Sequence, residues 1–236
     1  MKKYVPIFFI LMWQIISMIV NNSIIVPSIL EIIQAMCSYL TQPKFYMSIL
    51  FTMQRVIIGI VISLLLAFIL GIFSYKNRYV KEIVEPIVSF LQTIPQISYI
   101  VILLVWCKSE VALYVILLFM LFPIGYHNIL QGLENIDDDL VDVIILYHQP
   151  LFFNIRKVYL PMIKPYIMAT LDSIIPLSIK VIVMSEIFVS SSQGIGRLLY
   201  FARVQIDTAS ILALTIYMVL IIQGLLYIYK IITKRT

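Results

Sequence analysis

Three ionisable side chains lie inside one apolar stretch of the chain, because Asp172, Lys180 and Glu186 all fall within residues 165–189. An ionisable group at bilayer depth costs at least about 2.5–3.5 kcal/mol, so each one needs water or a polar partner. On a helix with about 100° per residue, Asp172 and Glu186 return to within about 40° of each other, and Lys180 lies about 80° from Asp172. This arrangement predicts a hydrated path. The alternative is that the two acids lie near the headgroups while Lys180 snorkels or pairs.

The residue patterns of catalytic sites are missing from the chain. It has no Gly-x4-Gly-Lys-Ser/Thr loop for ATP phosphates, no His-Glu-x-x-His pair and no Gly-x-Ser-x-Gly turn. Its two histidines, His127 and His148, lie in separate segments, and Cys37 and Cys107 fit no metal-ligand spacing. We therefore expect no enzyme activity, metal or cofactor from this chain, and an ATPase would have to be another polypeptide.

Composition predicts that membrane-spanning helices position these residues. Of the 236 residues, 62% are hydrophobic and 12% charged, and the mean hydropathy is +1.03, whereas soluble domains have about 45–50% apolar and about 25% charged residues. A helical span needs about 20 apolar residues. We expect an all-α membrane protein with about six transmembrane helices. A cleaved signal peptide is the alternative for the first span. The apolar runs are residues 5–20, 56–75, 86–107, 111–133, 165–189 and 208–229.

The distribution of Lys and Arg predicts the orientation. With the N-terminus in the cytoplasm, eleven of the seventeen cationic residues lie inside and four outside, and Arg55 and Lys180 complete the count at or within spans. Because cytoplasmic loops are enriched in Lys and Arg, both termini are predicted to be cytoplasmic. The two longest connections are then residues 21–44 outside and residues 131–164 inside.

The inner connection has its own helical pattern. Residues 137–139 are three aspartates, and the apolar residues Leu140, Val143, Ile144 and Tyr147 follow at the spacing of one helix face. This helix is predicted to end before Pro150, and a second amphipathic piece, residues 151–158, to end at Leu160-Pro161. Such a pair suits the groove of another protein. The alternative is an interfacial helix on lipid headgroups.

The spacing in this connection resembles the signature loop of binding-protein-dependent ABC importer permeases. That loop has Glu-Ala-Ala, three residues, Gly, nine residues and Ile-x-Leu-Pro. Here Val158 stands at the Ile, His148 at the Gly, and Asp142-Val143-Ile144 at Glu-Ala-Ala. Histidine takes a left-handed turn less readily than glycine, and Val143 and Ile144 are bulkier than alanine and would push a docked helix outward.

Further anchors extend the resemblance, to the nitrate/sulfonate/taurine type, over about residues 26–215 in chain order. They are Val26-Pro27-Ser28 before an apolar helix, Thr52-x-x-Arg55 with Gly59, Ile94-Pro95 followed by Trp106 and Glu110, Phe122-Pro123 followed by Gly132, and Ser185-Glu186 followed by Gly194-Ile195-Gly196.

The resemblance implies the fold of a type I ABC importer permease. Residues 1–45 would hold the first helix and an extracytoplasmic loop, and residues 46–236 the transmembrane core with a coupling loop at residues 131–164 between spans 4 and 5. It implies two copies of a cytoplasmic ATP-binding subunit, a second permease subunit expected to be another copy of this chain, and an extracytoplasmic solute-binding protein. No nucleic acid partner is expected. The membrane is expected to be a bacterial plasma membrane.

Particular residues are candidates for the path and for each partner contact. Lys180, Glu186 and Asp172 are candidates for the translocation path. The pair Gly194-x-Gly196 predicts a turn outside the membrane, where Arg197 would contact the binding protein. The contacts with the ATP-binding subunit would fall on Asp142, Val143, Ile144, Tyr147, His148 and Leu151 in the coupling loop.

The function that the resemblance implies is import of a small polar solute of the sulfonate/oxyanion or vitamin-precursor class. ATP hydrolysed on a separate subunit would power it. The alternative is a secondary transporter or channel without an ATPase partner, which charges inside a span would also suit. The structured inner connection and the lack of an internal repeat favour the importer.

Overall fold

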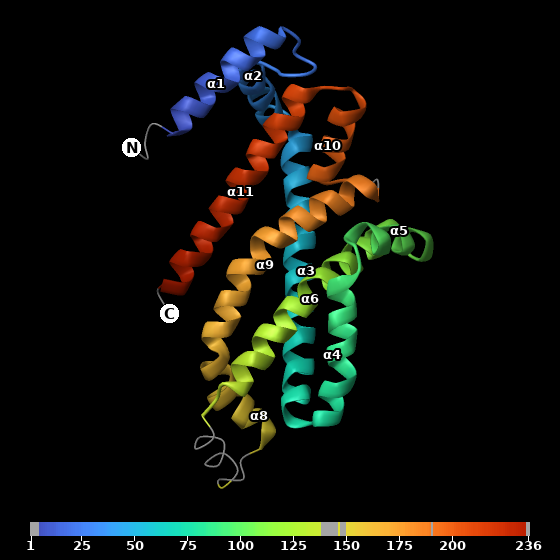
Figure 1. Ribbon diagram of the computed structural model, residues 1–236, viewed down its shortest axis with the longest axis vertical. Coiled ribbons are helices and arrows are strands. Elements are labelled where there is room, and N and C mark those ends of the chain that lie inside the picture. The colour runs from blue at the N-terminus through green and yellow to red at the C-terminus, as the bar shows by residue number, and fades with distance from the viewer. Residues whose placement is uncertain (1–4, 138–145, 147–149, 190, 235–236) are drawn as a thin grey trace. The chain divides into compact units, whose positions relative to one another are not determined.

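A computed structural model describes the chain apart from residues 1–4, 138–145, 147–149, 190 and 235–236 (Figure 1). The part of the chain that it describes is helical and contains no strand, which confirms the all-α fold class. The helices are α1 (Val5–Val20), α2 (Ile29–Leu40), α3 (Pro43–Lys76), α4 (Arg78–Thr93), α5 (Gln96–Trp106), α6 (Ser109–Glu134), α8 (Leu151–Asn154), the π-helical η1 (Ile155–Tyr159), α9 (Leu160–Phe188), α10 (Ile195–Val204) and α11 (Thr208–Lys234).

The helices form two compact units, which are described separately. The first unit consists of Met1–Gln54 and Ile182–Thr236, and the second of Arg55–Val181. The long helices α3 and α9 each contribute residues to both units. The division at residue 45 predicted from the sequence stays a prediction.

In the first unit, the segment between α1 and α2 is fixed by hydrogen bonds. Ser28 caps α2: its Oγ accepts from the Glu31 N–H (3.3 Å), and the Ser28 N–H donates to Glu31 Oε2 (2.7 Å). Trp13 Nε1 of α1 donates to the Pro27 carbonyl (3.0 Å). The reciprocal hydrogen bonds between Ser28 and Glu31 satisfy two backbone N–H groups that have no partner within the helix. The predicted outer connection, residues 21–44, therefore contains a capped helix.

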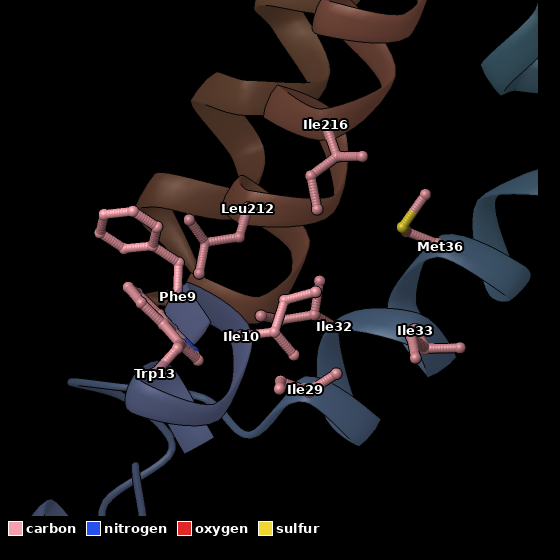
Figure 2. Close-up of a pocket in the computed structure, with 9 residues that line it drawn as sticks. All are labelled: Phe9, Ile10, Trp13, Ile29, Ile32, Ile33, Met36, Leu212 and Ile216. Atoms are coloured by element: carbon pink, nitrogen blue, oxygen red, sulfur yellow. The ribbon is translucent and has the colours of Figure 1, made fainter. Parts of the chain in front are cut away.

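Helix α11 closes this unit against α2. The Tyr217 hydroxyl donates to the Met36 carbonyl (2.8 Å), and the Tyr217 ring lies 4.8 Å from that of Phe45, centroid to centroid. An apolar pocket of about 390 Å³ lies among α1, α2 and α11. The residues that line it are apolar apart from the indole N–H of Trp13, which already donates to the Pro27 carbonyl. Figure 2 shows Phe9, Ile10 and Trp13 from α1, Ile29, Ile32, Ile33 and Met36 from α2, and Leu212 and Ile216 from α11.

In the second unit, α3 and α6 pack closely along a row of small residues. A Cβ built on Gly59 would lie 2.5 Å from Leu117 Cδ1, and one on Gly125 would lie 3.0 Å from Ala67 Cβ. Small residues at helix contacts in membranes let backbones approach in this way. Near the C-terminal end of α3, the buried Tyr126 hydroxyl of α6 donates to Ser74 Oγ (2.9 Å).

The predicted third span is broken into two helices. Helices α4 and α5 pass together as one span by length and hydropathy, but they are bent by 102° at Ile94 and Pro95 (Figure 1). Proline lacks an N–H and disfavours helical geometry in the residue before it, which explains why the break falls there. The apolar run over residues 86–107 was expected to be interrupted at Pro95, and the structure has its break there.

Among the residues that the structure describes, four helices are long and apolar enough to cross a membrane, and the bent pair makes up to five. The four are α3, α6, α9 with the preceding π-turn, and α11. Helix α1 is shorter, at 16 residues. The described spans therefore match five of the six predicted runs, and the first run is a short apolar helix.

The predicted break at Leu160-Pro161 does not occur. Helices α8, η1 and α9 follow each other without interruption from Leu151 to Phe188. The Leu160 N–H donates to the Ile155 carbonyl, five residues back, as expected of a π-turn. This wider turn makes room for the ring of Pro161, which would otherwise clash with the preceding turn of an α-helix.

Candidate functional site

A buried carboxylate joins three helices in the first unit. The Glu186 side chain of α9 is 0% exposed. Thr52 of α3 donates from its hydroxyl to both Glu186 oxygens (2.9 and 3.0 Å), and the Gly196 N–H of α10 donates to Oε2 (2.9 Å). The Ile195 N–H in turn donates to Thr52 Oγ1 (2.9 Å). The negative charge thus lies at the N-terminus of α10, where a helix dipole stabilises an anion.

Two glycines make room for this carboxylate. Gly194 has a φ of +133°, and a Cβ there would lie 2.4 Å from Glu186 Oε2. A Cβ on Gly196 would lie 2.5 Å from both Glu186 Cβ and the Val183 carbonyl oxygen. Glycine is the residue that tolerates both the positive φ and the close approach. The Gly194-x-Gly196 pattern is therefore explained by Glu186, which lies earlier in the chain.

The other two candidates for the translocation path have different surroundings. Asp172 and Lys180 of α9 are both exposed and belong to the second unit, whereas Glu186 is enclosed in the first. In the structure, Glu186 therefore links α9 to α3 and α10 through hydrogen bonds. The assignment of the three residues to a path stays a prediction.

Arg197 lies in the first turn of α10 and lines a cavity. Its Nη1 donates to the Ser191 carbonyl (3.1 Å), and its guanidinium carbon lies 5.1 Å from the centre of the Phe201 ring. The cavity has a volume of about 570 Å³ and also includes Lys44 and Ser48 from the start of α3. We call it the Lys44–Arg197 cavity. Sequence reasoning missed Lys44, because residues so far apart carry no common pattern.

Arg55 and Glu110 form an ion pair between α3 and α6 in the second unit. Arg55 Nε and Nη2 donate to the two oxygens of Glu110 at 3.1 and 2.7 Å, which is bidentate geometry. The Arg55 side chain is 4% exposed and that of Glu110 is 51% exposed. The sequence named both residues as separate anchors and did not pair them.

The two sides of the inner connection are held by polar contacts in the second unit. Lys81 of α4 pairs with Glu134 at the end of α6 (2.7 Å) and with Glu85 (3.5 Å). Just after α6, Asn135 Nδ2 donates to the Tyr166 hydroxyl of α9 (3.0 Å). Of the six predicted contact residues, Leu151 begins α8. Asp142, Val143, Ile144, Tyr147 and His148 lie outside the described residues.

The described residues contain no group of three or more His, Cys, Asp or Glu that could hold a metal ion. Both cysteines, Cys37 and Cys107, are free, and His127 is exposed on α6.

Comparisons with known proteins give a family match over most of the chain. The sequence model of the binding-protein-dependent transport system inner membrane component family matches residues 59–236. An ABC transporter permease protein of Methanocaldococcus jannaschii is 22% identical over 238 residues, covering 97% of this chain and 89% of the relative. The formylaminopyrimidine transport permease protein ThiX of Halalkalibacterium halodurans is 24% identical over 206 residues (84% and 79%). The bicarbonate transport system permease protein CmpB of Synechococcus elongatus is 29% identical over 168 residues (70% and 60%).

Proposed function

The chain belongs to the family of binding-protein-dependent transport system inner membrane components, the permeases of ABC importers, and we propose that it carries the solute while a separate polypeptide hydrolyses ATP. One combination supports this division of labour. The described part of the chain has four to five helices able to span a membrane, and residues 131–164 are the predicted inner connection, but the 236 residues include no loop for ATP phosphates.

The inner connection is the proposed docking element for two cytoplasmic ATP-binding subunits. Its contact residues would be Asp142, Val143, Ile144, Tyr147, His148 and Leu151. Polar contacts where α6 ends support this role. Lys81 ties the end of α6 to α4, and Asn135 ties it to Tyr166 of α9. Force applied to the connection would therefore reach α4, α6 and α9 together.

The proposed translocation path uses α9. Lys180 and Asp172 are exposed ionisable groups in a helix able to span the membrane, and such groups face water or partners rather than lipid. We place them on a hydrated face shared with a second permease subunit, which we propose is another copy of this chain. Glu186, enclosed by α3 and α10, would hold the outer end of that path in shape.

The outer partner is proposed to be a solute-binding protein in contact with Arg197. The excess of Lys and Arg in the predicted inner segments supports an orientation with both termini in the cytoplasm. The α9–α10 turn would then lie outside a bacterial plasma membrane. Arg197 is held there by Ser191 and Phe201.

The solute is proposed to be small and polar, of the sulfonate/oxyanion or vitamin-precursor class. The relatives support a class rather than one compound, because one is named for formylaminopyrimidine and another for bicarbonate. Specificity in such systems would belong to the binding protein. The ligand can therefore be found by screening for compounds that raise the melting temperature of the binding protein encoded beside this gene.

Reconstitution tests the function. The purified chain, its ATP-binding subunit and the binding protein are placed in proteoliposomes, and uptake of the solute found by that screen is measured. We expect uptake with ATP, and none with a non-hydrolysable analogue or without the binding protein. Uptake by the chain alone under an ion gradient would instead identify a secondary transporter or channel.

A further inference from the structure

The Lys44–Arg197 cavity is enclosed by parts of the first unit that are distant in the sequence. Lys44 and Ser48 lie one helical turn apart at the start of α3, Ser192 comes from the α9–α10 turn, and Arg197 and Phe201 lie one turn apart on α10. The volume of about 570 Å³ is within the usual range of about 300–1,000 Å³ for small-molecule sites.

The charge lining this cavity is entirely positive. Lys44 and Arg197 both line it, and no Asp or Glu is among its lining residues. Within the described part of the chain, neither cation forms an ion pair. The carboxylate of Glu186 is enclosed by Thr52 and Gly196, so its charge is already engaged by the start of α10.

Arg197 is held in place rather than left free. Its Nη1 donates to the Ser191 carbonyl, and its guanidinium lies over the Phe201 ring. A guanidinium has five N–H donors in a planar fork, so those contacts leave donors for a planar or tetrahedral oxyanion. Because the side chain is already fixed before binding, less conformational entropy is lost when a ligand binds.

The other residues that line the cavity indicate which chemical groups a ligand would have. Ser48 and Ser192 bring hydroxyl groups, which can donate to oxyanion oxygens, and Met47, Leu198 and Phe201 bring apolar surface. We propose that this cavity binds a small organic anion, with a carboxylate or sulfonate head between Lys44 and Arg197 and a short apolar body against Phe201. The proposal narrows the solute class of the proposed function and rests on it for the outward position of the cavity.

Binding to the purified chain alone provides the test, with radiolabelled ethanesulfonate as the probe in equilibrium dialysis. No ATP-binding subunit or binding protein is present. We expect saturable binding that weakens as salt rises, because the cations are partly exposed, and no competition by neutral ethyl methyl sulfone. Lys44→Gln and Arg197→Gln should each weaken binding by about tenfold or more, the effect of losing a hydrogen bond to a charged group. Arg203→Gln on the same helix is the matched control and should bind normally.

The lipid headgroup is the competing source of an oxyanion. The measurement is therefore repeated in nanodiscs of phosphatidylcholine with and without phosphatidylglycerol. Equal binding in both supports a free solute. Displacement by phosphatidylglycerol would assign the cavity to lipid phosphate and overturn the proposal.

Two further results would also overturn it: no saturable binding, or unchanged binding in the Lys44→Gln variant. Lys44 is exposed, so that variant keeps the test decisive even where Arg197→Gln fails to fold. Failure here is separable from failure of the proposed function. Absent binding alongside ATP-driven uptake rejects only the cavity, whereas binding without such uptake rejects only the importer.

Discussion

The backbone N–H of Gly196 donates a 2.9 Å hydrogen bond to Oε2 of Glu186, and this contact joins the start of α10 to the end of α9. The same carboxylate accepts from Thr52 of α3. A motif that resembles a family signature, Ser185-Glu186 with the later Gly194-Ile195-Gly196, is therefore one hydrogen-bonded unit. Its members are a buried acid and the two residues that leave space for it.

The first prediction concerns the charge in this unit. Glu186→Gln keeps the shape but removes the negative charge and one of the two carboxylate oxygens that accept from Thr52 and Gly196. The free energy of unfolding should fall by about 1–3 kcal/mol, the usual effect of leaving a buried polar group unsatisfied. Thermal unfolding of the purified chain in detergent measures it. Thr52→Ser keeps the hydroxyl and should cost less than Thr52→Val, and equal losses in these two variants would contradict the hydrogen-bonding role.

The second prediction concerns the space around Glu186. Gly196→Ala places a methyl group 2.5 Å from Glu186 Cβ and from the Val183 carbonyl oxygen. We therefore expect the free energy of unfolding to fall by about 1–3 kcal/mol. Gly224→Ala on α11 is the matched control because nothing lies within 4 Å of the added carbon. Since alanine favours helix more than glycine does, this control should be neutral or stabilising by up to about 1 kcal/mol. Similar thermal shifts in both variants would refute the close approach.

The third prediction compares two ion pairs. Glu110→Gln removes the negative charge and one of the two acceptor oxygens that pair with the buried Arg55 guanidinium, and it should destabilise the chain by about 1 kcal/mol or more. Glu82→Gln breaks the exposed pair with Arg78 at 2.9 Å and should change stability by no more than about 0.5 kcal/mol. Thermal unfolding of both variants side by side measures the difference, which should shrink little with added salt. An equal loss of stability in the two variants would mean that burial of Arg55 does not strengthen its ion pair.

The fourth prediction concerns the proposed path. Lys180→Met removes a charge from α9 and should reduce ATP-driven uptake severalfold while leaving assembly with the ATP-binding subunit intact. Lys230→Met, at the end of α11, is the control for removal of a lysine and should transport normally. The measurement is uptake in proteoliposomes together with co-purification of the ATP-binding subunit. Normal uptake by Lys180→Met would show that Lys180 only snorkels to the surface.

The fifth prediction concerns the proposed coupling loop. His148→Gly should retain both transport and its coupling to ATP hydrolysis, because glycine accommodates a tight turn at least as well as histidine. Asp142→Lys should uncouple hydrolysis from uptake without unfolding the chain. ATPase rate and uptake are measured in the same proteoliposomes. Normal coupling in Asp142→Lys would remove this residue from the docking surface.

The helices and their breaks could largely be predicted from the sequence. Apolar runs marked α3, α6, α9 and α11, and Pro95 marked the bend between α4 and α5. Such features depend on neighbours in the chain, which local patterns report. The π-turn before Pro161 was not foreseen, because proline there predicts a break and only the wider turn relieves the clash.

The contacts of the site could not be predicted in the same way. Thr52 and Glu186 are 134 residues apart, and Arg55 and Glu110 are 55 apart. Each of these residues was named as part of a motif, but no spacing rule pairs a hydroxyl on one helix with a carboxylate on another. Glu186 was predicted to share a hydrated face with Asp172 and Lys180, and no spacing in the sequence indicated its hydrogen bonds with Thr52 and Gly196. The pairing arises from packing, which the glycines permit.

The path of the bent pair α4–α5 determines whether the chain crosses the membrane an even or an odd number of times. If the two halves cross the bilayer together, they count as one crossing. With α1 also crossing, the N- and C-termini then lie on the same side, and the connection at residues 131–164 lies on that side as well. If the halves dip in and return, the crossing is lost, and the connection and the C-terminus move to the face opposite the N-terminus. Whether this bent pair crosses the bilayer or returns therefore decides which compartment the rest of the chain faces.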